Sequence, residues 1–185
     1  MRRIAIVMAV LIAAALSATA AFGSSVHFKK GGTPTCTISG TGTPTVSVTC
    51  TGNVAGLGGE NIEIDVTLSG FAVYQCQNPS TKNTPPGQNR VLVGPATTPT
   101  TIGSDEIKNG NLLFTTDPAS LSAPTTVSSA AAGCPGANWT GVNPQLTLTD
   151  ITLKFYQPPP STLVFTCNAH NDSGLSGTVT LSCTF

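Results

Sequence analysis

A histidine and several carboxylates are the side chains in this sequence that acid–base chemistry could use. His170 lies in the polar segment Asn168–Gly174, two residues before Asp172. No G-x-S-x-G nucleophile motif accompanies this pair, so the sequence favours a solvated turn there. Glu63 and Asp65 share one strand face within roughly 7 Å, a separation that glycoside hydrolysis can use. Their alternation with apolar residues favours a solvent-exposed strand face, and a hydrolase with a carboxylate site remains an alternative.

Metal binding finds little support in the sequence. The segment Asn168–Gly174, with Asp150 as a further candidate, offers oxygen ligands of the kind that calcium prefers, but it lacks a recognisable calcium-binding signature. Zinc needs closely spaced cysteine or histidine ligands, whereas the nearest two cysteines are 14 residues apart. The only other histidine, His27, lies near the N-terminus. No metal site and no cofactor are predicted.

The cysteines favour disulfide bonds over metal or redox chemistry. There are six, an even number, and they are Cys36, Cys50, Cys76, Cys134, Cys167 and Cys183. An even count in an exported chain predicts three disulfides, although six cysteines allow 15 pairings. Neighbour pairing is preferred: 36 with 50, 76 with 134, and 167 with 183. The first and last of these pairs flank candidate hairpin turns at Gly40–Gly42 and at Ser173–Gly174.

Two side chains are candidates for contact with a ligand. Trp139 is the only tryptophan and follows Cys134 in a turn, where an exposed indole could stack on a sugar ring. The sequence favours the other interpretation, in which Trp139 closes one end of the core. Lys82 lies in the polar, proline-containing loop 77–89, next to Cys76. A loop of this kind could present Lys82 to a protease as an inhibitor does, since proline stiffening preorganises it.

The N-terminus has the pattern of a secretory signal peptide. Arg2 and Arg3 precede an apolar run from Ile4 to Ala15, and Ala18–Ala20 fits the small-x-small cleavage pattern. The run is shorter than the roughly 20 apolar residues that span a bilayer. We therefore expect a cleaved signal at 1–20, a flexible lead at 21–34 and a single domain at 35–185, with no membrane span in the mature form. The mature chain is expected to be secreted and extracellular, or loosely associated with the cell surface.

Composition excludes several classes of partner. Removing the signal takes away two of the 8 basic residues, so 6 remain against 8 acidic ones and the net charge is near −2. This is not the basic footprint of a nucleic-acid-binding protein. Charged residues make up 9% of the chain, against about 25% in typical soluble domains. Thr, Ser, Gly, Pro and Asn take their place, a mixture that favours strands and turns over helices.

Alternation of apolar and polar residues predicts strands at short intervals. The clearest runs from Ile62 to Cys76, and Gly70 is a natural place for a bend in it. Further strands are expected at 45–50, 90–94, 111–116, 146–155, 162–168 and 178–184. Within 146–155 the phase of alternation reverses, which predicts a β-bulge near Thr149–Asp150. One helical turn is expected around Ser128–Ala132. About eight strands with frequent turns predict an all-β fold, an antiparallel β-sandwich of Ig-like or jelly-roll-like type braced by disulfides.

Four segments together carry a resemblance to one group of proteins. They are Cys50–Gly58, Pro85–Asn89, Lys108–Asn111 and Cys134–Trp139. In these turns and cysteines the chain resembles the small, uncharacterised, exported, β-rich proteins of actinobacteria and similar bacteria. The resemblance covers most of the mature chain and implies a bacterial, exported, β-rich domain, and it implies no activity.

The sequence therefore predicts a secreted, non-catalytic β-domain that binds an extracellular glycan or protein. Two alternatives remain open: an inhibitor-like or effector protein acting through the loop tethered by Cys76, and a hydrolase with a carboxylate site. Each assigns its function to different residues, namely Trp139, Lys82, or the Glu63–Asp65 pair.

Overall fold

Strands form where apolar side chains alternate with hydroxyl or amide side chains. The computed structural model describes residues 26–80 and 84–185, so the signal peptide expected at 1–20 and Lys82 lie outside the described residues. β4 (Ile62–Gln77) is the clearest strand, because its even positions are buried and its odd positions half-buried from end to end. The strand predicted at Ile62–Cys76 is confirmed.

The first sheet, sheet A, is built around one central strand. Its six strands are β1 (His27–Phe28), β2 (Thr35–Ser39), β3 (Thr45–Ala55), β6 (Asn111–Thr115), β7 (Ala119–Ser122) and β11 (Gly177–Thr180). β3 pairs with β1 and β2 along one side and with β6 and β7 along the other. β11 pairs with β2 and forms an outer edge. All of these pairings are antiparallel.

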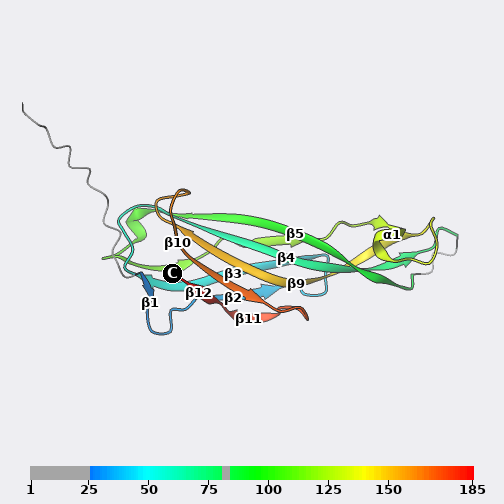
Figure 1. Ribbon diagram of the computed structural model, residues 1–185, viewed down its shortest axis with the longest axis horizontal. Coiled ribbons are helices and arrows are strands. Elements are labelled where there is room, and N and C mark those ends of the chain that lie inside the picture. Colours follow the sequence, from blue (N-terminus) through cyan, green and yellow to red (C-terminus); the bar gives the residue numbers. More distant parts are fainter. Residues whose placement is uncertain (1–25, 81–83) are drawn as a thin grey trace, which may run out of the picture.

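The second sheet, sheet B, contains the longest strands of the molecule. Besides β4 it comprises β5 (Pro86–Ile102), β8 (Val127–Ser128), β9 (Thr140–Tyr156), β10 (Leu163–His170) and β12 (Ser182–Thr184). The order is β12-β10-β9-β4-β5, again antiparallel, with β8 beside the start of β9. In Figure 1, β4, β5 and β9 run along the long axis and extend beyond sheet A to a tip that carries the short helix α1 (Ser129–Ala132). A 3₁₀ turn, Ser104–Glu106, follows β5.

The apolar faces of the two sheets meet in one hydrophobic core. Phe155 of β9 stacks on Phe165 of β10 with ring centroids 4.0 Å apart. Phe114 of sheet A meets Phe155 edge-on at 5.0 Å, so the aromatic cluster joins the two sheets. The antiparallel sandwich expected from the sequence is confirmed, because two antiparallel sheets enclose this core.

The structure has more strands than the eight expected, for identifiable reasons. β1, β7 and β8 have two to four residues each, too few to show a periodic pattern in the sequence. The sequence predicts only the part 90–94 of β5, because the prolines on either side of it are typical of loops. β5 runs from Pro86 to Ile102 and tolerates them because it is an edge strand, hydrogen-bonded to β4 alone.

The last predicted strand, 178–184, is divided between the two sheets. Its first part, β11, pairs with β2 in sheet A, and its second part, β12, pairs with β10 in sheet B. Leu181, which lies between the two parts, is buried. The antiparallel pairing expected between 162–168 and 178–184 is therefore confirmed for Ser182–Thr184. It is wrong for the first part of the segment, which crosses to sheet A and pairs with β2. One strand pattern in the sequence cannot reveal that its two halves have different partners.

Part of the expected N-terminal lead belongs to the folded domain. Residues 26–34 are described, and within them His27 and Phe28 pair with Ala55 and Val54 of β3. Phe28 packs edge-on against Phe165, with ring centroids 5.1 Å apart. This part of the range 21–34 is therefore paired and packed, because Phe28 completes the aromatic cluster at that end of the core.

The three disulfides join the neighbouring cysteines along the chain. Cys36–Cys50 links β2 to β3 and Cys167–Cys183 links β10 to β12, each between directly opposite residues. Cys76–Cys134 fastens the segment after α1 to the end of β4. This is the pairing preferred from the sequence. Three disulfides indicate an oxidising, extracellular type of environment.

Within the described residues, no helix is long and apolar enough to cross a membrane.

Candidate functional site

The outer surface of sheet A consists almost entirely of polar side chains. Strand alternation turns one set of its side chains away from the core, and nearly all of them carry a hydroxyl or an amide group. They are Thr35, Thr37, Ser39, Thr45, Ser47, Thr49, Thr51, Asn53, Asn111, Leu113, Thr115, Ser120, Ser122, Thr178 and Thr180, together with the exposed His27 of β1. We call this surface the hydroxyl face. None of the six strands of sheet A contains Lys, Arg, Asp or Glu.

Strand register arranges the hydroxyl face in rows that cross the sheet. In one row Thr180, Thr35, Thr51 and Thr115 stand opposite one another on four strands. The side-chain oxygens of Thr35 and Thr51 in this row lie 3.4 Å apart. Neighbouring strands are about 4.8 Å apart, and successive rows lie about 6.8 Å apart along a strand. The face therefore presents polar groups at regular intervals.

Two further rows repeat the pattern. Thr178, Thr37 and Thr49 form the second, and Ser39, Ser47 and Ser120 the third. At the end of the sheet the Oγ1 of Thr45 lies 2.9 Å from the Oγ of Ser122. The sequence contains the signal for this arrangement in three T-x-T segments, 35–37, 49–51 and 178–180. Sequence reasoning missed the face because only the fold places these segments side by side.

A hollow of about 240 Å³ opens at one end of the hydroxyl face. Its lining includes Lys30, Thr33, Thr35, Thr51, Asn53 and Leu113, together with three glycines. We call it the Lys30 hollow. Its polar groups come from both the sheet and the loop between β1 and β2, which stands out beneath sheet A in Figure 1. The hollow combines hydroxyl, amide and ammonium groups with one apolar side chain, since Leu113 is 77% exposed.

A second hollow, of about 290 Å³, lies beside the start of β10 and has a more apolar lining that includes Val26, Leu163 and Val164. Gln157 also lines it, although this side chain is 1% exposed. The Gln157 amide accepts a hydrogen bond from Gly58 N–H and donates to the carbonyls of Gly58 and Glu60. Because its amide is fully used by the backbone, Gln157 holds the loop before β4 in place and has no group left for a ligand.

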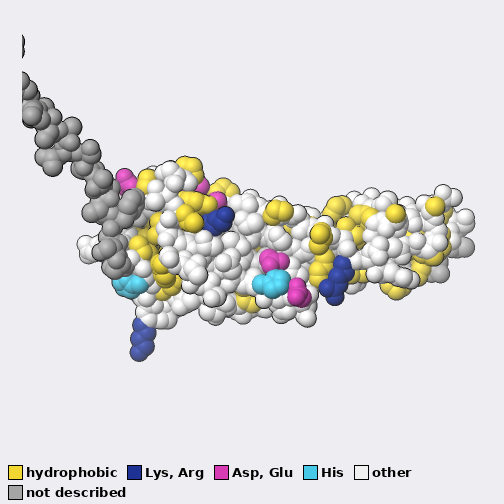
Figure 2. All heavy atoms as spheres, in the orientation of Figure 1, with side chains coloured by type: hydrophobic (Ala, Val, Ile, Leu, Met, Phe, Trp, Pro, Cys, Tyr) yellow, Lys and Arg dark blue, Asp and Glu magenta, His cyan; other side chains and the backbone are white. Residues whose placement is uncertain are grey.

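The fold brings His170 together with two carboxylates on the outer surface of sheet B. His170 Nδ1 lies 2.6 Å from Asp150 Oδ1, and Nε2 lies 3.1 Å from Asp172 Oδ1. Asp150 also accepts a hydrogen bond from Thr149 Oγ1 at 2.6 Å. Figure 2 shows histidine and acidic side chains gathered at the middle of this view, beside hydrophobic and basic ones. The sequence placed Asp172 near His170, and the fold adds Asp150 as the cross-strand partner.

The electrostatics of this cluster favour the charged form of each partner. The hydrogen bond to Asp150 and the charges of both carboxylates raise the pKa of His170. Partial burial raises the pKa of Asp150, but the hydrogen bonds from Thr149 and His170 and the imidazolium charge outweigh it, so that pKa is lowered. A catalytic histidine needs one ring nitrogen directed at the nucleophile. Here Nε2 contacts the Asp172 carboxylate, so each ring nitrogen already has a carboxylate partner.

The cluster is also poorly arranged to hold a metal ion. The two carboxylates approach opposite nitrogens of one ring and so do not converge on a common point. Among the described residues, no group of three or more His, Cys, Asp or Glu side chains is placed to bind a metal. Glu63 and Asp65, the other carboxylate pair considered, lie on the outer surface of sheet B opposite Tyr156 and Lys154.

Trp139 lies at the tip of sheet B, in the segment that follows α1. The indole is half-buried, packs against the core and covers Gly136, where an added Cβ would lie 2.7 Å from the ring. The helical turn expected around Ser128–Ala132 is confirmed as α1. The interpretation that Trp139 closes the end of the core fits this packing, and its remaining exposed surface keeps it a candidate ligand contact.

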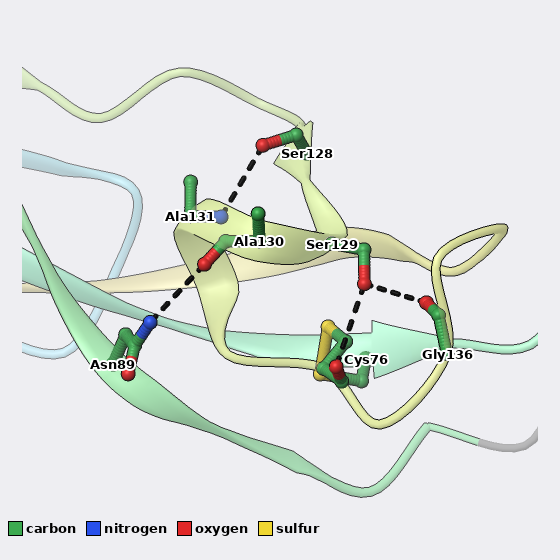
Figure 3. Close-up of a disulfide and its surroundings, with 8 residues drawn as sticks. Cys76, Asn89, Ser128, Ser129, Ala130, Ala131 and Gly136 are labelled. Atoms are coloured by element: carbon green, nitrogen blue, oxygen red, sulfur yellow. Dashed lines mark hydrogen bonds between the residues drawn. A yellow bond between two sulfur atoms is a disulfide. The ribbon is translucent and has the colours of Figure 1, made fainter.

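Hydrogen bonds and a disulfide fix the tip around α1 (Figure 3). Ser128 caps the helix by accepting from Ala131 N–H at 3.2 Å, and Asn89 of β5 donates to the carbonyl of Ala130 at 3.1 Å. Ser129 Oγ donates to the carbonyl of Gly136, beside the Cys76–Cys134 disulfide. These contacts join α1 and the segment after it to β4 and β5. The loop that carries Lys82 begins at the tip, but Lys82 itself lies outside the described residues, so the inhibitor-loop hypothesis stays a prediction.

Comparison of this chain with models of known protein families, with characterised proteins and with solved structures finds no match.

Proposed function

We propose that this protein is a secreted, non-catalytic binding domain that binds extracellular polysaccharide through the hydroxyl face of sheet A. The observation that carries the proposal is the contrast between the two sheets. The strands of sheet A contain no Lys, Arg, Asp or Glu, and their one titratable side chain is His27 of β1, whereas the strands of sheet B contain Glu63, Asp65, Arg90, Asp150 and Lys154. An extended surface of one uncharged, polar kind matches the surface of a polysaccharide.

The chemistry of the face supports this partner. Threonine and serine hydroxyls both donate and accept hydrogen bonds, as sugar hydroxyls do. Each such bond adds only about 1 kcal/mol in water, so binding depends on many of them forming together. A sheet holds its side chains in fixed rows, which lowers the entropy lost on binding. The rows of sheet A therefore suit a repetitive ligand better than a small molecule.

The oxidising environment that the disulfides indicate fits an extracellular ligand. The signal-peptide pattern at 1–20 supports secretion, and the bacterial resemblance points to cell-wall or matrix polysaccharides as the available targets. Neither metal nor cofactor is needed for binding of this kind.

A pull-down of the mature domain on cellulose, chitin, cross-linked pectate and bacterial cell walls tests the proposal. The key variant is Thr37→Glu with Thr178→Glu, which places two carboxylates in one row of the hydroxyl face. We expect binding to fall about tenfold or more, because a carboxylate buried against sugar without a partner costs over 1.4 kcal/mol. The matched control, Thr97→Glu with Thr101→Glu, alters exposed threonines on the outer surface of sheet B.

The two variants decide between surfaces. Loss in the sheet A variant with retention in the sheet B control supports the hydroxyl face. Equal retention in both, or no binding by a folded wild type to any of the four materials, overturns the proposal. Trp139→Ala is included because Trp139 is the other candidate contact. We expect it to bind like the wild type, and loss of binding by this variant alone would move the site to the tip.

A further inference from the structure

The Lys30 hollow owes its shape to a tight turn that is hydrogen-bonded to sheet A. Gly32 N–H donates to the carbonyl of Lys29 at 2.7 Å, and Gly31 has a φ of +72°, which suits the third position of a type II turn. Lys30 therefore occupies the exposed corner of this turn. The sequence Lys-Gly-Gly provides the glycine that the positive φ requires.

Backbone hydrogen bonds hold the turn against β3. Lys29 N–H donates to the carbonyl of Asn53 at 3.1 Å, and Asn53 N–H donates to the carbonyl of Gly32 at 2.9 Å. The approach is so close that a Cβ on Gly32 would lie 2.5 Å from the Asn53 carbonyl oxygen. Lys30 is thus carried by an anchored turn at the end of the hydroxyl face, although its own side chain is exposed.

The groups around the hollow differ in chemistry from the rest of the face. Lys30 adds a positive charge to a surface whose strands contain no Lys or Arg, and no acidic residue lines the hollow. Thr35, Thr51 and Asn53 supply hydroxyl and amide groups, and Leu113 supplies an apolar surface. The hollow has a volume of about 240 Å³, whereas pockets for drug-sized ligands begin at roughly 300 Å³. A hollow of this size suits a single sugar ring.

We infer that the Lys30 hollow binds the carboxylate-bearing ring of a uronic acid, so that the preferred ligand is an acidic polysaccharide. This inference rests on the proposed function and names the class of polysaccharide. The Lys30 ammonium pairs with the sugar carboxylate, the polar groups of Thr35, Thr51 and Asn53 meet the ring hydroxyls, and Leu113 contacts the C–H groups. The hydroxyl face then continues along the chain of sugars.

The test measures binding of the folded mature domain to polygalacturonate and to the same polymer after methyl esterification, at one ionic strength. Esterification removes the charge and leaves the sugar ring in place. We expect the acidic form to bind about tenfold more tightly, as befits one charge-assisted hydrogen bond. Lys30→Ala should remove this preference, and Lys30→Arg should retain most of it. Lys29→Ala is the matched control, because its side chain is exposed next to the hollow and does not line it.

The outcomes separate this inference from the proposed function. Equal binding of both polymers, with loss in the Thr37→Glu/Thr178→Glu variant, would leave the hydroxyl face as a glycan site and overturn the role of Lys30. Loss of binding in Lys29→Ala equal to that in Lys30→Ala would also overturn it, because the charge would then act without the hollow. Acetate that competes as strongly as digalacturonate would show a simple anion site and overturn recognition of the sugar. Binding of neither polymer, or of any other polysaccharide, would overturn both proposals.

Discussion

The imidazole Nδ1 of His170 lies 2.6 Å from Oδ1 of Asp150, its cross-strand partner on β9. The contact exists because Thr149 is a bulged residue: Ser69 of β4 pairs with Asp150, and Gly70 pairs with Leu148. The bulge reverses the phase of alternation, so that Asp150 faces outward while Leu148 and Ile151 are both buried. The bulge predicted near Thr149–Asp150 is therefore confirmed, and it brings a carboxylate to the histidine.

This ion pair predicts a pH-dependent contribution to stability. Because the pKa of His170 is raised in the folded state, its contribution is complete below about pH 6.5, the unfolded value, and is lost as pH rises through the folded pKa. Because the pKa of Asp150 is lowered, its contribution is present above the unfolded pKa of about 3.9 and is lost as pH falls through the folded value. The pair therefore stabilises most between about pH 4 and 6.5.

Titration of the His170 imidazole by NMR checks this directly. Asp150→Asn should bring the pKa of His170 down towards its ordinary value, and Asp172→Asn should lower it less, because Asp172 is 91% exposed at its side chain and farther from the ring. In denaturant unfolding, Asp150→Asn should lower the free energy of unfolding at pH 5.5. At pH 9 the same substitution should lower it much less. An unchanged pKa of His170 in Asp150→Asn would contradict the geometry.

Removal of the Cys76–Cys134 disulfide should cost more stability than removal of Cys36–Cys50. Its cysteines are 58 residues apart in sequence, against 14 for the other pair, so it restricts the unfolded chain more. The chain-entropy model gives about 4 kcal/mol for the longer loop and about 3 kcal/mol for the shorter one. Denaturant unfolding of the two Cys→Ala double variants compares them. A larger loss for the shorter loop would show that packing around the buried Cys36 and Cys50 outweighs loop length.

Gln157→Leu should destabilise the domain by about 1–3 kcal/mol, because Gly58 N–H and the carbonyls of Gly58 and Glu60 lose their partner. Leucine keeps a similar volume, so the loss reports hydrogen bonds rather than a cavity. The control is Gln145→Leu, an exposed glutamine on β9 whose replacement should change stability by less than about 0.5 kcal/mol. Chemical unfolding of the three proteins decides, and equal stability of wild type and Gln157→Leu would refute the structural role.

Gly141→Ala should loosen the tip that carries α1. An added Cβ would lie 2.6 Å from Val127 Cγ2 and 2.8 Å from Ala132 Cβ, so the helix must move away from sheet B. Overpacking of this kind costs about 1–3 kcal/mol. Gly59→Ala is the matched control, because nothing lies within 4 Å of its added Cβ. Hydrogen exchange of the α1 amides should increase in Gly141→Ala alone, and unchanged protection there would contradict the close packing.

The sequence alone was sufficient for the local features that depend on neighbouring residues. Strict alternation over Ile62–Cys76 predicted β4, and the phase change at Thr149–Asp150 predicted the bulge. Ser128 and the alanines that follow it were sufficient for the one turn of helix, because a capping side chain and good helix formers are local properties. The preference for pairing Cys36 with Cys50 rests on the candidate hairpin turn between them, which is also a local feature, although the sequence leaves the other pairings open.

Tertiary structure decided which strands share a sheet, and with that the candidate sites. Thr115 and Thr180 are far in sequence from the hairpin that contains Thr35 and Thr51, so only strand register shows that all four form one row. The division of 178–184 between β11 and β12 depends on partners that alternation does not encode. The position of Lys30 at the end of the hydroxyl face depends on the hydrogen bonds between its turn and Asn53 of β3. Alternation in a sequence specifies which face of a strand is buried, whereas the position of that strand in a sheet depends on contacts between distant segments.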